Sequence, residues 1–179
     1  MKTSYLFART SLLLIFAIGL NFQVVAGPLD SLELKGMIFN NNSRVKDVVV
    51  NIYNHNKLFK EIHVKSSNRF VTNLPVNTIV TIEITAPNFH AKRFVIDTKV
   101  PGKITKSQLM YSFDIDIFKE DELKNINTSF LDFPVGLVSF DKKKRKFIRN
   151  KQYTKRMKKA YLKLWAESQE AERQGKGLE

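Results

Sequence analysis

Short β-branched runs, separated by clusters of turn-forming residues, fill the chain from residue 32 to residue 98. Turn signals recur about every 8 to 12 residues, a spacing that is typical of a β-sandwich or a β-barrel. The sequence therefore predicts a mainly β fold for this region. The runs that we predict as strands are 32–39, 48–53, 58–64, 69–72, 78–85 and 91–98.

The β domain is predicted to end in a hairpin. Residues 120–129 are polar and indicate a loop or a short helix. Two apolar runs, 135–140 and 146–148, then flank the charged residues 141–145, which is the pattern of a β-hairpin with a solvated tip. We predict a single β domain over residues 30–149, with this hairpin as an extension.

From Asn150 onward the hydrophobic period changes to that of a helix. Apolar or small side chains recur at three and four residues, and good helix-forming residues dominate. Lysines and arginines occupy the opposite face. The stripe consists of Tyr153, Met157, Ala160 or Tyr161, Leu164 and Ser168. We predict a basic amphipathic helix over 150–172, stopped by Gly175 and Gly177, and a flexible tail over 173–179.

The first 26 residues have the parts of a secretory signal peptide. Lys2 and Arg9 make a basic start, residues 11–20 are apolar, and small residues precede a break after Ala26. The apolar run is shorter than the roughly 20 residues that span a bilayer. We therefore expect cleavage near Ala26, with an uncleaved anchor as the alternative.

The chain has no cysteine, so it can form no disulfide framework and no lipid-anchored lipoprotein. Secreted eukaryotic domains of this size often carry disulfides, so their absence favours a bacterial envelope protein. We expect the mature protein in the periplasm or at the outer-membrane periphery.

Positive charge is concentrated in one late segment. The chain has a formal net charge of +13, from 30 Lys and Arg against 17 Asp and Glu. Residues 140–163 hold 12 Lys and Arg and one Asp, a net charge of +11, whereas residues 27–139 hold 14 and 12. The basic character therefore belongs to the hairpin tip and the helix.

Residues 34–98 resemble the carboxypeptidase regulatory-like domains, which are transthyretin-like, Ig-like β-sandwiches. Family positions are filled by Gly36, Val48, Val50, Ile52, Tyr53, Phe70, Leu74, Ile82, Ile84, Pro87, Phe89 and Lys92. Asn68-Arg69 replaces the usual Asp-Gly, and Asn88 replaces the usual Gly. Because Asn tolerates a left-handed backbone, both turns can survive. The resemblance implies a β-sandwich.

The later stretches "SFDIDIF" and "GLVSFDKKKRKFIRNKQYTKRMK" resemble the tails of small uncharacterised envelope proteins of Bacteroidota-type bacteria. This resemblance and the previous one together cover nearly all of the chain that follows the predicted signal peptide. Their motifs concern packing, and they imply an envelope location and a binding or scaffolding role, without a reaction.

The sequence offers no pattern of catalytic residues. It has no nucleophile elbow, no glycine-rich phosphate loop and no Ser/His/Asp order. His55, His63 and His90 lack the close spacing of a zinc pair. We therefore predict that the protein is not an enzyme and has no cofactor.

Asp114 and Asp116 alternate with apolar residues in a predicted strand over 109–118, so they share one face of it. With an acid from residues 120–122 they are candidate Ca²⁺ ligands. A solvated strand face followed by an acidic loop explains the same residues, as does pairing with the basic segment. We predict no metal site.

The basic segment remains as the candidate site. A nuclear address conflicts with the secretion signal, and nucleic acid is an unsuitable partner for an envelope protein. We predict contact with an anionic envelope surface, such as lipid headgroups, lipopolysaccharide or acidic glycan. The residues predicted to make it are Lys142, Lys143, Lys144, Arg145, Lys146, Arg149, Lys155, Arg156, Lys158, Lys159 and Trp165.

Three alternatives stay open at the sequence level. The helix can dock on a partner protein through its apolar stripe, with the charges steering association. The sandwich can bind a small molecule or a carbohydrate. Finally, the helix can pack on its own sandwich, which leaves the lysines merely solvated.

Overall fold

The computed structural model describes residues 31–65, 67–102, 104–123 and 127–176. The predicted signal peptide and the last three residues of the predicted tail lie outside these residues. The strands are β1 (Ser31–Asn40), β2 (Ser43–Arg44), β3 (Val48–Asn54), β4 (Lys57–Val64), β5 (Arg69–Pro75), β6 (Ile79–Ala86), β7 (Phe89–Asp97), β8 (Met110–Asp116), β9 (Leu137–Asp141) and β10 (Lys146–Arg149). The helices are α1 (Lys151–Lys176) and the 3₁₀ turns η1 (Lys106–Gln108), η2 (Asp121–Leu123) and η3 (Ser129–Asp132).

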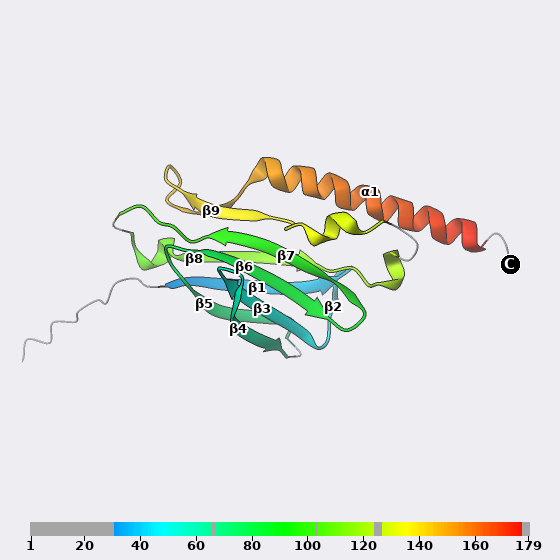
Figure 1. The fold of residues 1–179 in the computed structure, drawn as a ribbon, viewed down its shortest axis with the longest axis horizontal. Coiled ribbons are helices and arrows are strands. Elements are labelled where there is room, and N and C mark those ends of the chain that lie inside the picture. Colours follow the sequence, from blue (N-terminus) through cyan, green and yellow to red (C-terminus); the bar gives the residue numbers. More distant parts are fainter. Residues whose placement is uncertain (1–30, 66, 103, 124–126, 177–179) are drawn as a thin grey trace, which may run out of the picture.

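The strands form two sheets, which make a β-sandwich with a single long helix after it (Figure 1). One sheet has four strands, in which β1 pairs with β2, β5 and β8. The other has six strands in the order β10-β9-β7-β6-β3-β4. The predicted fold class, a mainly β sandwich with a hairpin extension and a C-terminal helix, is confirmed.

Strands close in the sequence pair antiparallel, but β8 runs parallel to β1 and β9 runs parallel to β7. The β9–β10 hairpin therefore extends the six-stranded sheet beyond β7, as the sequence predicts for residues 135–149. β8 forms an edge of the four-stranded sheet on the side of β1 opposite to β5.

The core lies between the two sheets and follows the period-two pattern of the strands. In β3 and β6 every second residue is apolar and buried, and the same alternation holds in the second half of β7, at Phe94 and Ile96. The fully buried side chains include Leu32, Leu34, Ile38, Ile52, Ile82, Ile84 and Ile96. The sequence pattern therefore identifies the core face of each strand correctly.

Gly36 lies where two aromatic rings approach the backbone of β1. A Cβ atom there would lie 2.3 Å from Phe70 Cε1 and 2.7 Å from Phe113 Cζ. The two rings meet edge to face with their centroids 5.9 Å apart, and Phe94 packs on Phe113 at 4.5 Å. The glycine allows this aromatic cluster to fill the centre of the sandwich.

The turns use asparagine where glycine is common. Asn68 and Asn88 have φ values of 47° and 63°, so both take the left-handed conformation that the sequence predicts for them. Asn68 is buried, and its Nδ2 donates a hydrogen bond of 2.7 Å to the Ile38 carbonyl oxygen. This side chain therefore ties the β4–β5 turn to β1.

α1 differs slightly from its prediction. It begins at Lys151, close to the predicted start, but it continues to Lys176 rather than ending near residue 172. Gly175, which the sequence predicts as a helix stop, lies inside it. One glycine in a helix costs only about 1 kcal/mol, so a long run of helix-forming residues can continue through it.

Candidate functional site

The hairpin tip carries a dense group of cations. Lys142, Lys143, Lys144 and Arg145 form the turn between β9 and β10, and all four are exposed. The Lys144 backbone N–H donates a hydrogen bond of 2.8 Å to the Asp141 carboxylate, and Arg145 has a positive φ of 50°. These local features close the turn.

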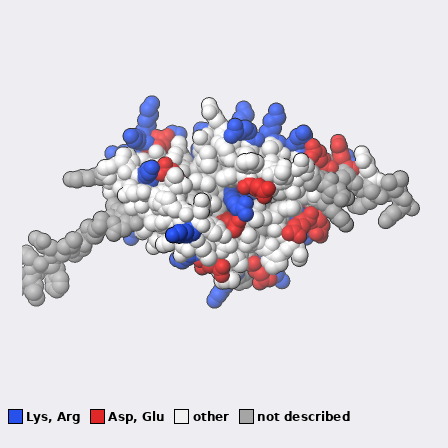
Figure 2. Space-filling view, viewed as in Figure 1, with Lys and Arg blue, Asp and Glu red and all other residues white. Residues whose placement is uncertain are grey.

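Exposed cations continue along β10 and the first turns of α1. Figure 2 shows Lys and Arg side chains gathered on the side of the molecule that carries the hairpin and the helix. We call the ten exposed cations that the sequence predicts as site residues the basic ridge. It comprises Lys142, Lys143, Lys144, Arg145, Lys146, Arg149, Lys155, Arg156, Lys158 and Lys159.

Carboxylates do not neutralise the basic ridge. Within the described residues there are four ion pairs within 4.0 Å, and none includes a ridge residue. The one pair on α1 joins Lys163 to Glu167 at 3.6 Å. Arg156 lies over the Tyr153 ring at 5.2 Å, and this aromatic neighbour carries no charge. The ridge charges are therefore available to an external anion.

The apolar stripe of α1 is occupied within the molecule. Leu164 is buried against Leu123 of η2 and Leu131 of η3. The Tyr161 ring stacks on Phe118, with centroids 5.4 Å apart, and meets Phe130 edge to face at 5.0 Å. The helix is therefore docked on its own sandwich, which answers one question that the sequence leaves open.

Polar contacts hold the two ends of this docking. The Tyr153 hydroxyl donates to the Pro134 carbonyl oxygen at 2.6 Å, and the Ser168 hydroxyl donates to the Glu122 carbonyl oxygen. Ser168 is buried, so its place in the predicted stripe follows from this hydrogen bond rather than from apolar contact. The helix is thus fixed near both ends of its packed stretch.

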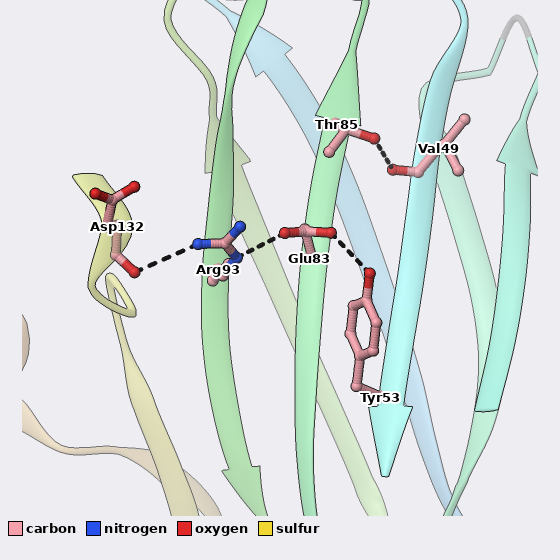
Figure 3. A network of polar contacts seen from close by, with 6 residues as sticks. All are labelled: Val49, Tyr53, Glu83, Thr85, Arg93 and Asp132. Atoms are coloured by element: carbon pink, nitrogen blue, oxygen red, sulfur yellow. Dashed lines mark hydrogen bonds and ion pairs between the residues drawn. The ribbon is translucent and has the colours of Figure 1, made fainter. Parts of the chain in front are cut away.

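A second polar network fastens η3 to the six-stranded sheet. Figure 3 shows Tyr53, Glu83 and Arg93 side by side across β3, β6 and β7. The Tyr53 hydroxyl donates to Glu83 at 3.0 Å, Arg93 Nε donates to the same carboxylate at 2.6 Å, and Arg93 reaches the Asp132 carbonyl oxygen at 3.5 Å. Burial, followed by the hydrogen bond to Glu83, raises the pKa of Tyr53. This network supports the surface on which α1 packs.

A cavity of about 440 Å³ lies between α1 and the sandwich. Its size is within the range of small-molecule sites, roughly 300 to 1,000 Å³. Strands β7, β8 and β9 and one face of α1 line it. The lining includes Lys92, Phe94, Tyr111, Phe113, Val138, Thr154, Met157, Tyr161, Leu162 and Trp165.

Trp165 belongs to this cavity rather than to the centre of the basic ridge. It is 48% exposed and lies one helical turn after Tyr161 and Leu162 on the face that lines the cavity. Arg149 and Lys158 belong to both, since they are exposed and also line the cavity. The ten predicted cations are therefore all exposed, on the hairpin and on α1, whereas Trp165 lines the cavity.

Lys92 extends into the same cavity from β7. Its Nζ lies 4.2 Å from the centroid of the Tyr161 ring and 5.3 Å from that of Phe118. It donates a hydrogen bond to the Asp116 carbonyl oxygen. Burial lowers the pKa of Lys92 to about 8, against the charge of Asp116, which raises it. Burial likewise raises the pKa of Tyr161.

Sequence reasoning missed the cavity, although one signal for Lys92 was present. Lys92 has the same parity as Phe94 and Ile96, which are buried on the core face of β7. A lysine at a core-facing strand position is uncommon unless it is partnered. The helix that roofs the lysine comes from residues far along the chain, so the enclosure itself has no local signal.

The candidate metal ligands do not come together. Within residues 31–176, apart from the few that the structure does not describe, no group of three or more His, Asp and Glu side chains could hold a metal ion. His63 contacts Glu61 at 2.8 Å, and both are exposed on β4. Asp114 and Asp116 are exposed on β8, where the sequence predicts them on one face.

No protein-family model matches the chain, and no curated protein matches it. Similar solved structures include 3-chlorocatechol 1,2-dioxygenase from Rhodococcus opacus 1CP, at 9% identity and a TM-score of 0.37, covering 50% of this chain and 60% of that one. Wild-type catechol 1,2-dioxygenase from Acinetobacter radioresistens has 11% identity and a TM-score of 0.37, covering 51% and 52%. S.CueP has 15% identity and a TM-score of 0.36, covering 50% and 62%.

These similarities are too distant to carry an argument about activity. The chain spans about 60% or less of the length of the two dioxygenases. Among the described helices, none is long and apolar enough to cross a membrane.

Proposed function

We propose that the protein is a non-enzymatic interaction module of the bacterial cell envelope, whose basic ridge contacts an anionic surface. Suitable surfaces are lipid headgroups, lipopolysaccharide or acidic glycan. The observation that carries the proposal is that the ridge cations are exposed and form no ion pair within the described part of the chain, while the apolar stripe of α1 is already packed. A periplasmic location and a transthyretin-like ancestry belong to this proposal, and the signal-peptide pattern and the β-sandwich support them.

The magnitude of the attraction is sufficient for reversible binding. A Lys or Arg close to an anionic membrane surface contributes about 1 kcal/mol. The ridge has ten such residues on the β9–β10 hairpin and α1, and a contact that engages half of them gains roughly 5 kcal/mol. Binding of this kind is electrostatic, so salt should weaken it as the Debye length falls from about 10 Å at 0.1 M to about 3 Å at 1 M.

Docking of α1 on a partner protein through its apolar stripe is less well supported. Leu164 and Met157 are 3% and 8% exposed, so an incoming partner would first have to displace the helix. A carbohydrate or small-molecule site on the sandwich has more support, because the cavity beside Lys92 is large enough for a small ligand.

The test is co-sedimentation with vesicles of phosphatidylcholine alone or mixed with phosphatidylglycerol, across a salt series. We compare wild type with a ridge-neutral variant, in which Lys142, Lys143, Lys144, Lys155, Arg156 and Lys159 are changed to Gln. The charge-matched control changes six exposed lysines outside the ridge to Gln, namely Lys46, Lys57, Lys65, Lys99, Lys106 and Lys119. Removal of α1 is unsuitable, because it would expose Leu123 and Leu131.

We expect wild type and the control to bind the anionic vesicles at low salt, and to dissociate at high salt. The ridge-neutral variant should lose at least tenfold in affinity. Equal binding by the ridge-neutral variant, or binding that survives 1 M salt, would contradict the proposal and direct attention to the alternatives.

A further inference from the structure

The cavity beneath α1 combines an apolar lining with a single inward cation. Its floor is formed by Phe94 and Phe113 from the sandwich and by Val138 from β9. Lys92 lies on the same face of β7 as Phe94, two residues away, so its ammonium group reaches the cavity beside an apolar floor. The remaining charged groups that line the cavity are Asp114, Asp116, Arg149 and Lys158, and each of them is exposed.

The ammonium group of Lys92 has unused hydrogen-bonding capacity. It carries three N–H donors, and one is taken by the Asp116 carbonyl oxygen. Within the described part of the chain no other acceptor bonds it, and no carboxylate lies within ion-pair distance. The rings of Tyr161 and Phe118 support the positive charge but accept no conventional hydrogen bond. An anion that enters the cavity would accept the remaining hydrogen bonds of the Lys92 ammonium group.

The exposed rim of the cavity carries two apolar side chains beside its four charged ones. Leu162 and Trp165, which line it from α1, are 56% and 48% exposed. The Thr154 hydroxyl oxygen, in the same lining, is buried and has no hydrogen-bond partner among the described residues. An apolar ligand body would cover Leu162 and Trp165, and a polar atom of the ligand could form a hydrogen bond with the Thr154 hydroxyl.

We propose that the cavity between α1 and the sandwich binds a carboxylic acid with an apolar body, whose carboxylate pairs with Lys92 and whose body lies against Phe94, Phe113 and Trp165. A cationic ligand would be repelled by Lys92, whose ammonium group already lies over the rings of Tyr161 and Phe118. A neutral apolar ligand would leave the charge of Lys92 unpaired. This inference does not depend on the basic ridge.

The test uses dodecanoate as the probe, below its micelle-forming concentration and without vesicles. Trp165 is the only tryptophan of the chain and lines the cavity, so its emission reports on occupancy. We expect a saturable change with one site per chain. Dodecanol and dodecyltrimethylammonium, which share the alkyl body, should bind at least tenfold more weakly. Binding of either analogue as tight as that of dodecanoate, or no saturable binding of dodecanoate, would overturn the proposal.

Two sets of variants locate the carboxylate. Lys92→Met should weaken dodecanoate at least tenfold, whereas Lys57→Met, on the exposed edge strand β4, should leave it unchanged. Leu162→Glu and Leu162→Gln have the same shape at a half-exposed position and differ in charge. The Glu variant should bind dodecanoate at least threefold more weakly than the Gln variant, while both bind dodecanol equally. Equal dodecanoate affinity within this pair would overturn the proposal even if Lys92→Met fails to fold.

The proposal for the basic ridge and the proposal for the cavity can be refuted separately. The ridge-neutral variant should bind dodecanoate as wild type does, because Lys92 and the cavity floor are unchanged in it. If that variant loses dodecanoate as well as vesicles, the acid binds the ridge and the cavity assignment is wrong. If it loses only vesicles, both proposals stand.

Discussion

At the scale of single residues, Lys92 is unusual because it is a lysine at a core-facing position of a strand. Desolvation disfavours its charged form, and a lysine in such surroundings titrates well below its ordinary range. The residue nevertheless lies on the core face of β7, directly under the packed helix. Its environment affects the stability of the protein as well as the binding of an anion.

The stability prediction concerns pH. Because the folded-state pKa is about 8 and the ordinary value is 10.5, the unfolded chain binds more protons between these values. The stability of wild type should therefore rise with pH in this window, relative to Lys92→Met. Between pH 7 and pH 10 the difference should change by about 2 to 3 kcal/mol in favour of wild type.

Urea unfolding of both proteins at several pH values measures this difference. Taking the difference cancels the titration of tyrosines and of the other lysines, which both proteins share. A difference that does not vary with pH would mean that Lys92 is solvated in the folded state.

Gly36 provides a second prediction at this scale. Gly36→Ala should destabilise the protein by about 1 to 3 kcal/mol, because the added methyl group would overlap the Phe70 and Phe113 rings. Gly136→Ala is the matched control, since a Cβ there would meet its nearest neighbours at 4.0 Å. Chemical denaturation of the three proteins gives the comparison, and equal stability of both variants would contradict the packing argument.

At the scale of elements, the docking of α1 depends on few side chains. Leu164→Ala should cost about 2 to 4 kcal/mol, because Leu164 is buried between η2 and η3. Leu162→Ala, two residues earlier and 56% exposed, should change stability by at most about 0.5 kcal/mol. Hydrogen exchange of the α1 amides, measured beside global unfolding, should show faster opening of the helix in the first variant only.

The elements were largely predictable from the sequence, because their signals are local. The period of two in β6 and the period near four in α1 come from alternation and helical geometry. The left-handed turns at Asn68 and Asn88 follow from residue chemistry. The pairing of β8 with β1, the pairing of β9 with β7 and the cavity involve segments far apart in the sequence, and no local pattern specifies them.

At the scale of the whole molecule, the uneven charge should itself lower stability at low salt. Residues 140–163 have a net charge of +11 from 12 cations and one acid, and the ridge cations have no ion-pair partners among the described residues. Screening relieves such repulsion. Raising NaCl from about 0.02 M to 0.3 M should raise the Tm of wild type by roughly 2 to 4 °C, the equivalent of about 1 kcal/mol. The ridge-neutral variant should show a much smaller rise of the Tm. Equal rises in both proteins would mean that the repulsion does not come from the ridge.

The order in which the parts of the fold occur along the chain has a consequence for biosynthesis. β1 pairs with its parallel neighbour β8 only after the 69 intervening residues 41–109, and the helix that roofs the cavity follows every strand. During vectorial synthesis or export the side of the sandwich between β7 and β8 therefore stays open until α1 has emerged. In that interval the apolar side chains Phe94, Phe113 and Leu131 face water, and such nascent surfaces are what holding chaperones bind.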